Sequence, residues 1–467
     1  MSFIANDINY SPGSKSMGAY KSPKFMKIDK NDSLSPIHEL SSEKIVEESE
    51  LIDIIQYLFV ETISNEELNI CKEKLANFPQ NLIPTNIPEN YIIAILDKYN
   101  KTQNSLEEDC FILVIECFSM IDDYHPLIQK MNFFNVTIDK IKNLSPNSFL
   151  MLKILANIYD SLENKYESLN AICSLIPALS NHNGNEIFDY LIHFFYNYSS
   201  SDFAAEDGSM LISNSLLSLL KDFEKKEMLL SSFSAERIFY IMRTLIQKFE
   251  EDFSEVLEHP IIANKNRYLF NDSPEVAISY IILSGILFYR NKNPFDLHVF
   301  DFLPFLTSKK KELISPSIWI LNIMVGSSED MANELNKINL LAFKDAYSEI
   351  DYNGKIEIAY LYQNLLGKIS NDYRFQFFND NFDMLFQFLD LENDEILENM
   401  LHLYSDVHFT LVEVGDEQMI NDFKNKLFSN DFSKLLDDVI IESQSENARL
   451  CAKELSLMFQ NGEENVR

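Results

Sequence analysis

The chain has 467 residues, which exceeds a single ordinary core and indicates either several domains or a repeat protein that grows by adding units. Only ten residues are glycine, and this favours helices joined by short turns over a β-rich protein. The formal net charge of −33 at pH 7 argues against direct binding of nucleic acid and favours partners with basic segments.

Residues 1–40 differ in composition from everything that follows. They contain three Ser-Pro pairs, which begin at Ser11, Ser22 and Ser35, and five lysines against three aspartates. Little apolar periodicity is visible there, so we expect a disordered, weakly basic arm. Two interpretations stay open. The arm is an inert tail, or it folds over an acidic body and is controlled by phosphorylation of these three serines.

The first predicted helices are marked by their amino-terminal capping residues. Ser42 can cap a helix that runs to about residue 63, and Ser64-Asn65-Glu66-Glu67 is a capping box that opens the next one. Pro88 opens a helix over residues 89–99. Ser105-Leu106-Glu107-Glu108 is a second capping box, which opens a helix that reaches about residue 121.

The next three predicted helices form one unit with a short, medium and long member. They cover 126–131, 133–142 and 147–159, with a turn at Asn132 between the first two. In the long helix, Phe149, Leu152, Leu155 and Tyr159 are three or four residues apart and therefore share one face. Such a unit cannot bury its apolar stripe alone, so it needs stacked neighbours.

The pattern Leu-Lys-Ile-Leu-Ala-Asn-Ile at 152–158 recurs in degraded form along the chain. Its marker position is Asn157, and equivalent positions follow one another at intervals of 37 to 47 residues. The eight markers are Cys117, Asn157, Asn197, Thr244, Gly285, Asn322, Asn364 and Ser405. A regular interval of this size predicts an all-α solenoid of three-helix repeats over 41–460, without significant β-sheet and with a flexible tail at 461–467.

Cysteine usage and apolar runs bear on the compartment. The five cysteines are an odd number without a CxxC pair, so we expect reduced packing residues and a reducing compartment. The longest apolar run, 277–289, is 13 residues long, which is shorter than a bilayer requires. No charged-then-apolar signal opens the sequence. We expect a protein that is not inserted in a membrane and resides in the cytoplasm, with the nucleus as a second location.

The helix at 152–158 resembles the third helix of armadillo repeats, in which an alternating apolar pattern ends in an Asn. The basic arm, the acidic body and about nine or ten repeats resemble importin-alpha within that family. The segment Glu48–Phe59 is similar to the entry into the first repeat there. The resemblance implies a right-handed superhelix and a concave groove lined by third helices.

In importin-alpha-like proteins the marker Asn and an aromatic residue four positions earlier hold an extended basic peptide. The Asn amide can bond the peptide backbone, and the aromatic ring takes a Lys or Arg side chain. The resemblance therefore implies peptide-binding roles for the following residues: Asn157, Asn197, Asn322, Asn364, His193, Tyr240 and Tyr360, with Trp319 three positions before Asn322. An importin-beta-type carrier would be a further partner.

The sequence predicts neither enzymatic activity nor a cofactor. The eight histidines form no HExxH or metal-spaced cluster, and no GxGxxG or GxxxxGK[ST] motif occurs. Two main interpretations of function stay open, beside a third in which the chain is an enzyme or enzyme regulator whose site matches no known motif. The first is an adaptor that binds Lys/Arg-rich cargo in an acidic groove for nuclear import. The second is a general armadillo or HEAT-like scaffold for protein partners outside nuclear transport.

Overall fold

The computed structural model describes the following residues: 49–59, 63–79, 83–143, 145–179, 185–202, 204–249, 253–290, 292–337, 341–369, 371–391, 393–415, 417–428 and 431–460. The predicted arm at 1–40 and the tail at 461–467 lie outside these ranges. Within them the chain forms helices, turns and loops, and no strand occurs. The described residues fall into two compact units, one up to Tyr268 and one from Leu269 onward.

The amino-terminal unit consists of short and long helices in succession. Its α-helices are α2 (Ser49–Tyr57), α3 (Asn65–Ala76), α4 (Glu89–Lys101), α5 (Ser105–Ser119), α6 (His125–Lys130), α7 (Phe133–Lys142), α8 (Ser148–Asn157), α9 (Lys165–Cys173), α10 (Ile176–Leu179), α11 (Asn185–Ser200), α12 (Glu206–Lys225), α13 (Ser232–Phe249) and α14 (Ser254–Leu257), and α15 (Lys265–Leu269) lies at its end. Two 3-10 turns, η2 (Asp122–Tyr124) and η3 (Tyr159–Ser161), accompany them.

The carboxyl-terminal unit continues the same alternation. Its α-helices are α16 (Pro274–Tyr289), α17 (Leu303–Leu306), α18 (Ile314–Ser327), α19 (Glu329–Asn336), α20 (Leu341–Glu349), α21 (Tyr352–Lys368), α22 (Asn371–Asp380), α23 (Phe382–Gln387), α24 (Asp394–Val414), α25 (Glu417–Phe428), α26 (Phe432–Glu442) and α27 (Glu446–Gln460). Its 3-10 turns are η4 (Val299–Asp301), η5 (Lys311–Leu313) and η6 (Phe388–Asp390).

The predicted three-helix unit is present as α6, α7 and α8, but its long member is shorter than predicted: α8 ends at Asn157 with 10 residues, as many as α7, and Tyr159 begins the separate turn η3. Asn132 separates the first two helices with a φ of 57°, a left-handed conformation that asparagine tolerates better than most residues. The longest marker interval, 47 residues from Asn197 to Thr244, corresponds to a different arrangement of helices. There the short and medium helices are replaced by the single 20-residue helix α12 before α13 begins.

One of the two predicted capping boxes is confirmed and the other is wrong. Ser64 accepts a hydrogen bond from the Glu67 amide, and the Glu67 carboxylate accepts one from the Ser64 amide. At α5, however, the cap is Asn104, whose Oδ1 accepts from the Leu106 amide at 3.0 Å. Asparagine caps helices as well as serine does, so the helix begins one residue earlier than a Ser105 cap implies.

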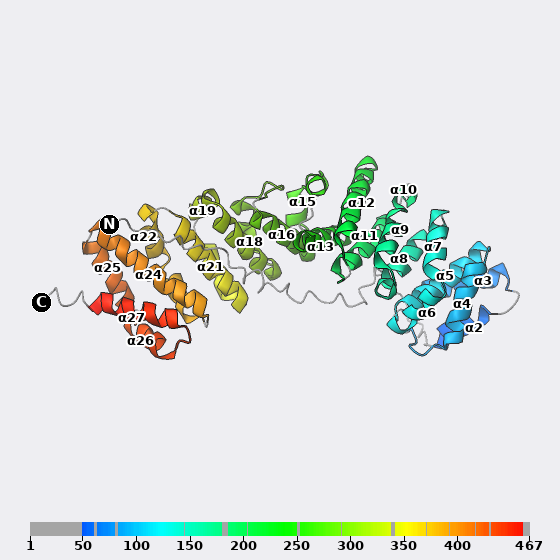
Figure 1. The fold of residues 1–467 in the computed structure, drawn as a ribbon, viewed down its shortest axis with the longest axis horizontal. Helices are drawn as coiled ribbons and strands as arrows, with labels where there is room; N and C mark the ends of the chain where they lie inside the picture. The colour runs from blue at the N-terminus through cyan, green and yellow to red at the C-terminus, as the bar shows by residue number, and fades with distance from the viewer. Residues whose placement is uncertain are drawn as a thin grey trace. The chain divides into compact units, whose positions relative to one another are not determined.

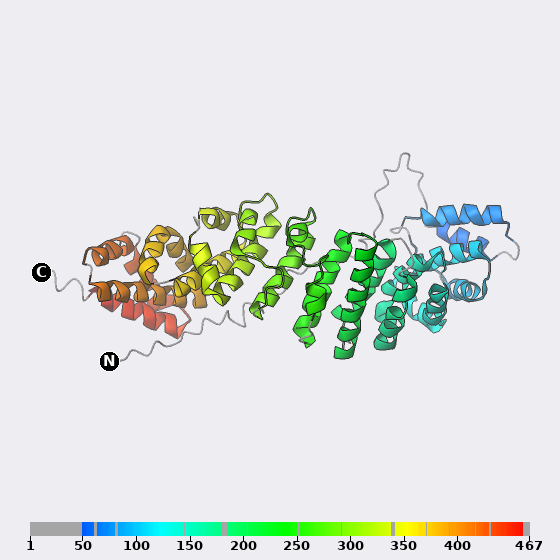
Figure 2. The same ribbon diagram turned by 90° about the horizontal axis from the view of Figure 1, so that it is seen from above.

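Within each compact unit, the last helix of one helical repeat, here called a group, packs on the last helix of the next group. These last helices form a row. In the amino-terminal row α5 contacts α8, α8 contacts α11, and α11 contacts α13. In the carboxyl-terminal row the order is α16, α18, α21, α24 and α27. Figure 1 shows the members of each row following one another within their unit, and Figure 2 shows them from above. Each row therefore repeats one packing relationship.

Polar bonds also connect each group of helices to the next. Lys72 pairs with Asp109 at 2.6 Å, and Lys153 pairs with Glu116 at the same distance. Lys310 donates to the carbonyl of Asn271 at 2.9 Å. The partners are 37 to 39 residues apart in the sequence, which is the repeat interval. These contacts help fix the register of one group against its neighbour.

Helix α16 contains most of the long apolar run and is buried on every side from Val276 to Phe288. None of the helices in the described part is long and apolar enough to cross a membrane. All five cysteines are free thiols; Cys71, Cys110 and Cys451 are buried and the other two are half-buried. The long run and the cysteines therefore serve the helical core.

Candidate functional site

The eight marker positions fall on eight successive helices of the two rows. Cys117, Asn157, Asn197 and Thr244 lie on α5, α8, α11 and α13, and the other four lie on α16, α18, α21 and α24. The predicted interval thus identifies one equivalent helix in each group.

The marker asparagines of the amino-terminal row connect neighbouring helices. Asn157 on α8 donates from Nδ2 to Ser119 Oγ on α5 at 3.0 Å. Asn197 on α11 donates to the carbonyl of Ala156 on α8 at 2.8 Å. Both side chains are half-buried. One amide donor of each residue is therefore used within the row.

The asparagines of the carboxyl-terminal row form a chain of hydrogen bonds between α18 and α21. Asn364 donates from Nδ2 to Asn322 Oδ1, and Asn322 donates to Glu357 Oε2 at 3.1 Å. Asn322 and Glu357 are each 7% exposed. Burial raises the pKa of Glu357 to about 7, although the bond from Asn322 acts in the opposite direction. Asn322 is thus enclosed between two helices.

Of the predicted aromatic positions on α11 and α13, Tyr240 is covered by an arginine of this same chain, and His193 is enclosed close to another. Arg237 lies over the ring of Phe233, and Arg243 lies 4.5 Å from the ring centroid of Tyr240. His193 is half-buried 6.1 Å from the Phe233 ring, and burial together with the charge of Arg237 lowers the pKa of its imidazole to about 3. At Tyr240 the cation that the resemblance assigns to a peptide is therefore supplied by the protein itself.

The remaining aromatic positions lie in different surroundings. Trp319 is 4% exposed, and its indole packs against Gly285 of α16, so its face is not accessible to a peptide. Tyr360 on α21 is half-buried, and burial and the negative charge of Glu395 on α24 raise the pKa of its hydroxyl. Tyr360 therefore combines an aromatic ring with a nearby carboxylate.

Reactive side chains in the described ranges include one cysteine that lies close to a histidine. No set of three or more His, Cys, Asp or Glu side chains there could hold a metal ion. The Sγ atom of Cys451 lies 3.2 Å from Nε2 of His402, but burial and nearby carboxylates raise the pKa of the thiol. A protonated thiol is a weak nucleophile, so this pair does not form an activated dyad.

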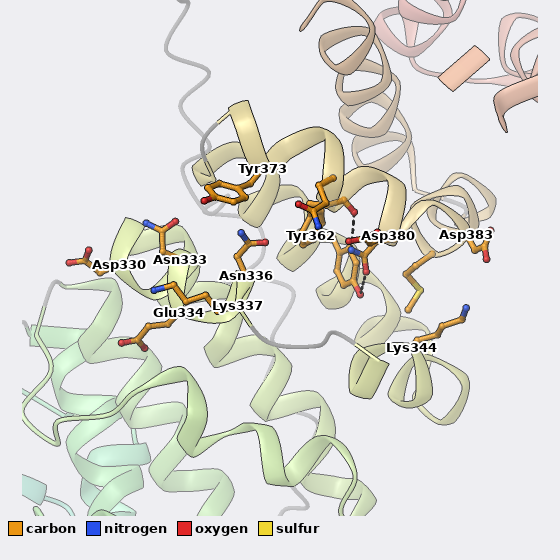
Figure 3. A pocket seen from close by; sticks show the side chains of 14 residues that line it. Asp330, Asn333, Glu334, Asn336, Lys337, Lys344, Tyr362, Tyr373, Asp380 and Asp383 are labelled. Carbon is orange, nitrogen blue, oxygen red and sulfur yellow. Dashed lines mark hydrogen bonds between the residues drawn. The ribbon is translucent and has the colours of Figure 1, made fainter. Parts of the chain in front are cut away.

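An open groove of about 1150 Å³ lies among α19, α20, α22 and α23 of the carboxyl-terminal unit. Figure 3 shows the side chains of α19 on one side and Tyr373, Tyr362 and Asp380 on the other. Four carboxylates and two ammonium groups line it: Asp330, Glu334, Asp380 and Asp383, with Lys337 and Lys344. The groove therefore has an acidic character.

Residue-by-residue patterns could not reveal this groove, because its walls are about forty to fifty positions apart in the sequence and each wall taken alone resembles a solvated helix face. The signal that could have indicated one wall is Asn379-Asp380-Asn381-Phe382-Asp383, a dense run of polar residues between two short helices. The predicted regulatory residues Ser11, Ser22 and Ser35 lie outside the described residues.

Comparison with known proteins gives a fold likeness alone. No family model matches the chain, and no curated protein matches it. Among solved structures, the crystal structure of an engineered protein is similar, with a TM-score of 0.60, 11% sequence identity, and coverage of 88% of this chain and 98% of that chain. At this level of identity the likeness concerns the helical architecture and carries no statement about activity or partners.

Proposed function

We propose that the protein is a non-catalytic scaffold of armadillo-type repeats that binds Lys/Arg-rich segments of partner proteins. The observation that supports it is the pair of helix rows, which offer extended repetitive surfaces, on a chain with a net charge of −33. Repetitive helical surfaces of this kind suit long, shallow protein contacts. Excess negative charge steers basic segments toward them.

Carboxylates supply the attraction in this proposal, and marker amides supply little of it. Asn157, Asn197 and Asn364 each use an amide donor to hold a neighbouring helix, so they have less to offer a ligand. A backbone hydrogen bond from such an amide contributes about 0.5–1.5 kcal/mol, and four would give only about 2–6 kcal/mol before ordering is subtracted. Binding should therefore depend strongly on ionic strength.

A more specific candidate function is that of an adaptor for nuclear import, of the importin-alpha kind. One feature favours it: the three half-buried marker asparagines, Asn157, Asn197 and Asn364, each keep an Oδ1 atom to which no other described residue donates. A peptide N–H could donate to such an oxygen. In that role the chain would also bind an importin-beta-type carrier.

Fluorescence anisotropy with the full chain tests the general proposal. An arginine-rich peptide should bind at about 50 mM salt and weaken at least tenfold at about 300 mM salt, whereas a glutamate-rich peptide of equal length should not bind. Affinity for the basic peptide that does not change with salt would refute the electrostatic mechanism. Capture of importin-beta together with basic cargo would support the import role, and deletion of residues 1–38 would test the arm.

A further inference from the structure

We propose that the groove among α19, α20, α22 and α23 is a docking site for an extended, arginine-containing segment of a partner protein. This inference rests on the proposed function and assigns it to one place. The groove is separate from the marker asparagines, since its walls come mainly from helices outside the row. Of the described lining residues, the one that lies on a row helix is Tyr362 of α21. Its volume of about 1150 Å³ exceeds the usual range for small-molecule pockets and suits several residues of peptide.

The charged residues of the two walls determine which sign of charge a ligand should carry. Asp330 lies on α19, Asp380 on α22 and Asp383 on α23. Among the described residues, none of the lysines, arginines or histidines forms an ion pair with any of these three carboxylates. Lys337 and Lys344 offset part of the charge, which leaves a net of two negative charges when Glu334 is included. A cationic ligand is therefore favoured.

Two polar groups in the walls lack good partners. Glu334 Oε2 is closed off from solvent and accepts no hydrogen bond from another described residue, and its other oxygen is 3.9 Å from His298 Nδ1. Tyr362 is 1% exposed, and its hydroxyl reaches only Asn381 Oδ1, at 3.5 Å. An unsatisfied carboxylate oxygen is unfavourable, and a rotation of the Glu334 side chain, which is 34% exposed as a whole, would let a guanidinium N–H bond it.

One aromatic ring favours arginine as the basic residue. Tyr373 on α22 is 59% exposed, and Figure 3 shows it above the groove, across from Asn336 of α19. A planar guanidinium can stack on such a ring while its N–H groups bond carboxylates, which a lysine ammonium cannot do. The amides of Asn333, Asn336 and Gln376 can bond the peptide backbone beside it.

The test uses the full chain and a fluorescein-labelled peptide with four Arg-Ser repeats, at about 50 mM salt. The groove variant is Asp330→Asn with Asp380→Asn, which preserves side-chain size. The matched control is Asp437→Asn with Asp438→Asn, two exposed residues of α26 in the same unit, which changes the net charge equally. We expect the groove variant to bind roughly five to ten times more weakly and the control to change less than about twofold.

Tyr373→Ala should weaken binding by a further factor of roughly two to five. A photo-reactive group on the peptide should cross-link to α19 or α22.

If the wild-type chain binds the peptide but the groove and control variants bind equally, the groove assignment is overturned and the proposed function stands. If the wild-type chain does not bind, the proposed function itself fails. Spermine that displaces the peptide at equal concentration would contradict a protein segment as the occupant. Circular dichroism confirms that each variant is folded.

Discussion

The indole of Trp319 occupies the space beside Gly285. A Cβ atom on Gly285 would lie 2.4 Å from Cζ3 and 2.6 Å from Cη2 of the indole, closer than real carbon contacts allow. Gly285 is on α16 and Trp319 is on α18, two neighbours in the carboxyl-terminal row. The marker position at 285 thus permits close approach of two helices, and the one tryptophan of the chain serves packing.

Gly285→Ala should destabilise the carboxyl-terminal unit by about 1–3 kcal/mol, because the added methyl group forces α16 and α18 apart. Urea unfolding followed by circular dichroism should show a lower midpoint. The matched control is Gly326→Ala on α18, which faces the next row helix, α21; a Cβ there would be 3.6 Å from Asn364 Nδ2, an ordinary contact. That variant should be neutral or stabilised by up to about 1 kcal/mol. Equal midpoints for both variants would show that the indole contact is not tight.

Asn197→Ala should lower stability by about 1 kcal/mol, because the carbonyl of Ala156 loses its donor from the neighbouring helix. Asn197→Asp should be at least as unfavourable, since the aspartate has no N–H and places a charge beside that carbonyl. Thermal unfolding measures both variants. If peptide affinity falls while the thermal midpoint is unchanged, Asn197 binds ligand and does not serve the row.

The repeat interval was readable in the sequence because every group must bury an equivalent apolar stripe against its neighbour. The marker at Asn157 and its recurrence at Asn197 and Asn364 thereby predicted the row helices. The partner of each amide could not be predicted, because Asn197 reaches Ala156, 41 residues earlier, and such a contact depends on how the helices pack. The first residue of α5 could not be predicted either, because Asn104 and Ser105 are adjacent and both are good helix caps.

The aromatic positions illustrate the same limit. A ring four residues before a marker predicts a cation-binding site only if the ring stays open. At Tyr240 the open face is taken by Arg243, which is three residues later on the same helix. The acidic groove depends on the opposite situation, in which α19 and α22 bring together carboxylates that no sequence pattern connects.

Glu357→Gln should stabilise the folded protein at pH 7.5 and have little effect at pH 4.5. The pKa of Glu357 rises from its ordinary value of 4.5 to about 7 on burial, so the folded state holds this proton more tightly than the unfolded state does. Stability from this group is full below pH 4.5 and is lost as pH rises through 7, by about 3 kcal/mol at most. Glutamine mimics the protonated acid and removes that loss.

Urea midpoints between pH 4.5 and 8 measure this difference. Glu446→Gln on α27, an exposed residue, is the control and should show a difference from wild type that does not depend on pH. If Glu357→Gln and wild type keep parallel pH profiles, the carboxyl group is ionised in the folded state and the Asn322 bond must hold a charge.

His408→Leu should protect the carboxyl-terminal helices from acid. His408 on α24 is 8% exposed, and neither ring nitrogen has a hydrogen-bond partner among the described residues. Its ring centroid lies 5.4 Å from that of Phe459 on α27. Burial and the charge of Lys424 lower the pKa of this imidazole below its ordinary value of 6.5. The unfolded state therefore gains the proton first, so the contribution of His408 to stability is full above pH 6.5 and is lost as the pH decreases below it.

Leucine removes the titrating group, so the urea midpoint of His408→Leu should rise relative to that of the wild type as the pH falls from 7.5 to 5.5. A profile for His408→Leu as steep as that of the wild type would mean that the imidazole is protonated without penalty in the folded protein.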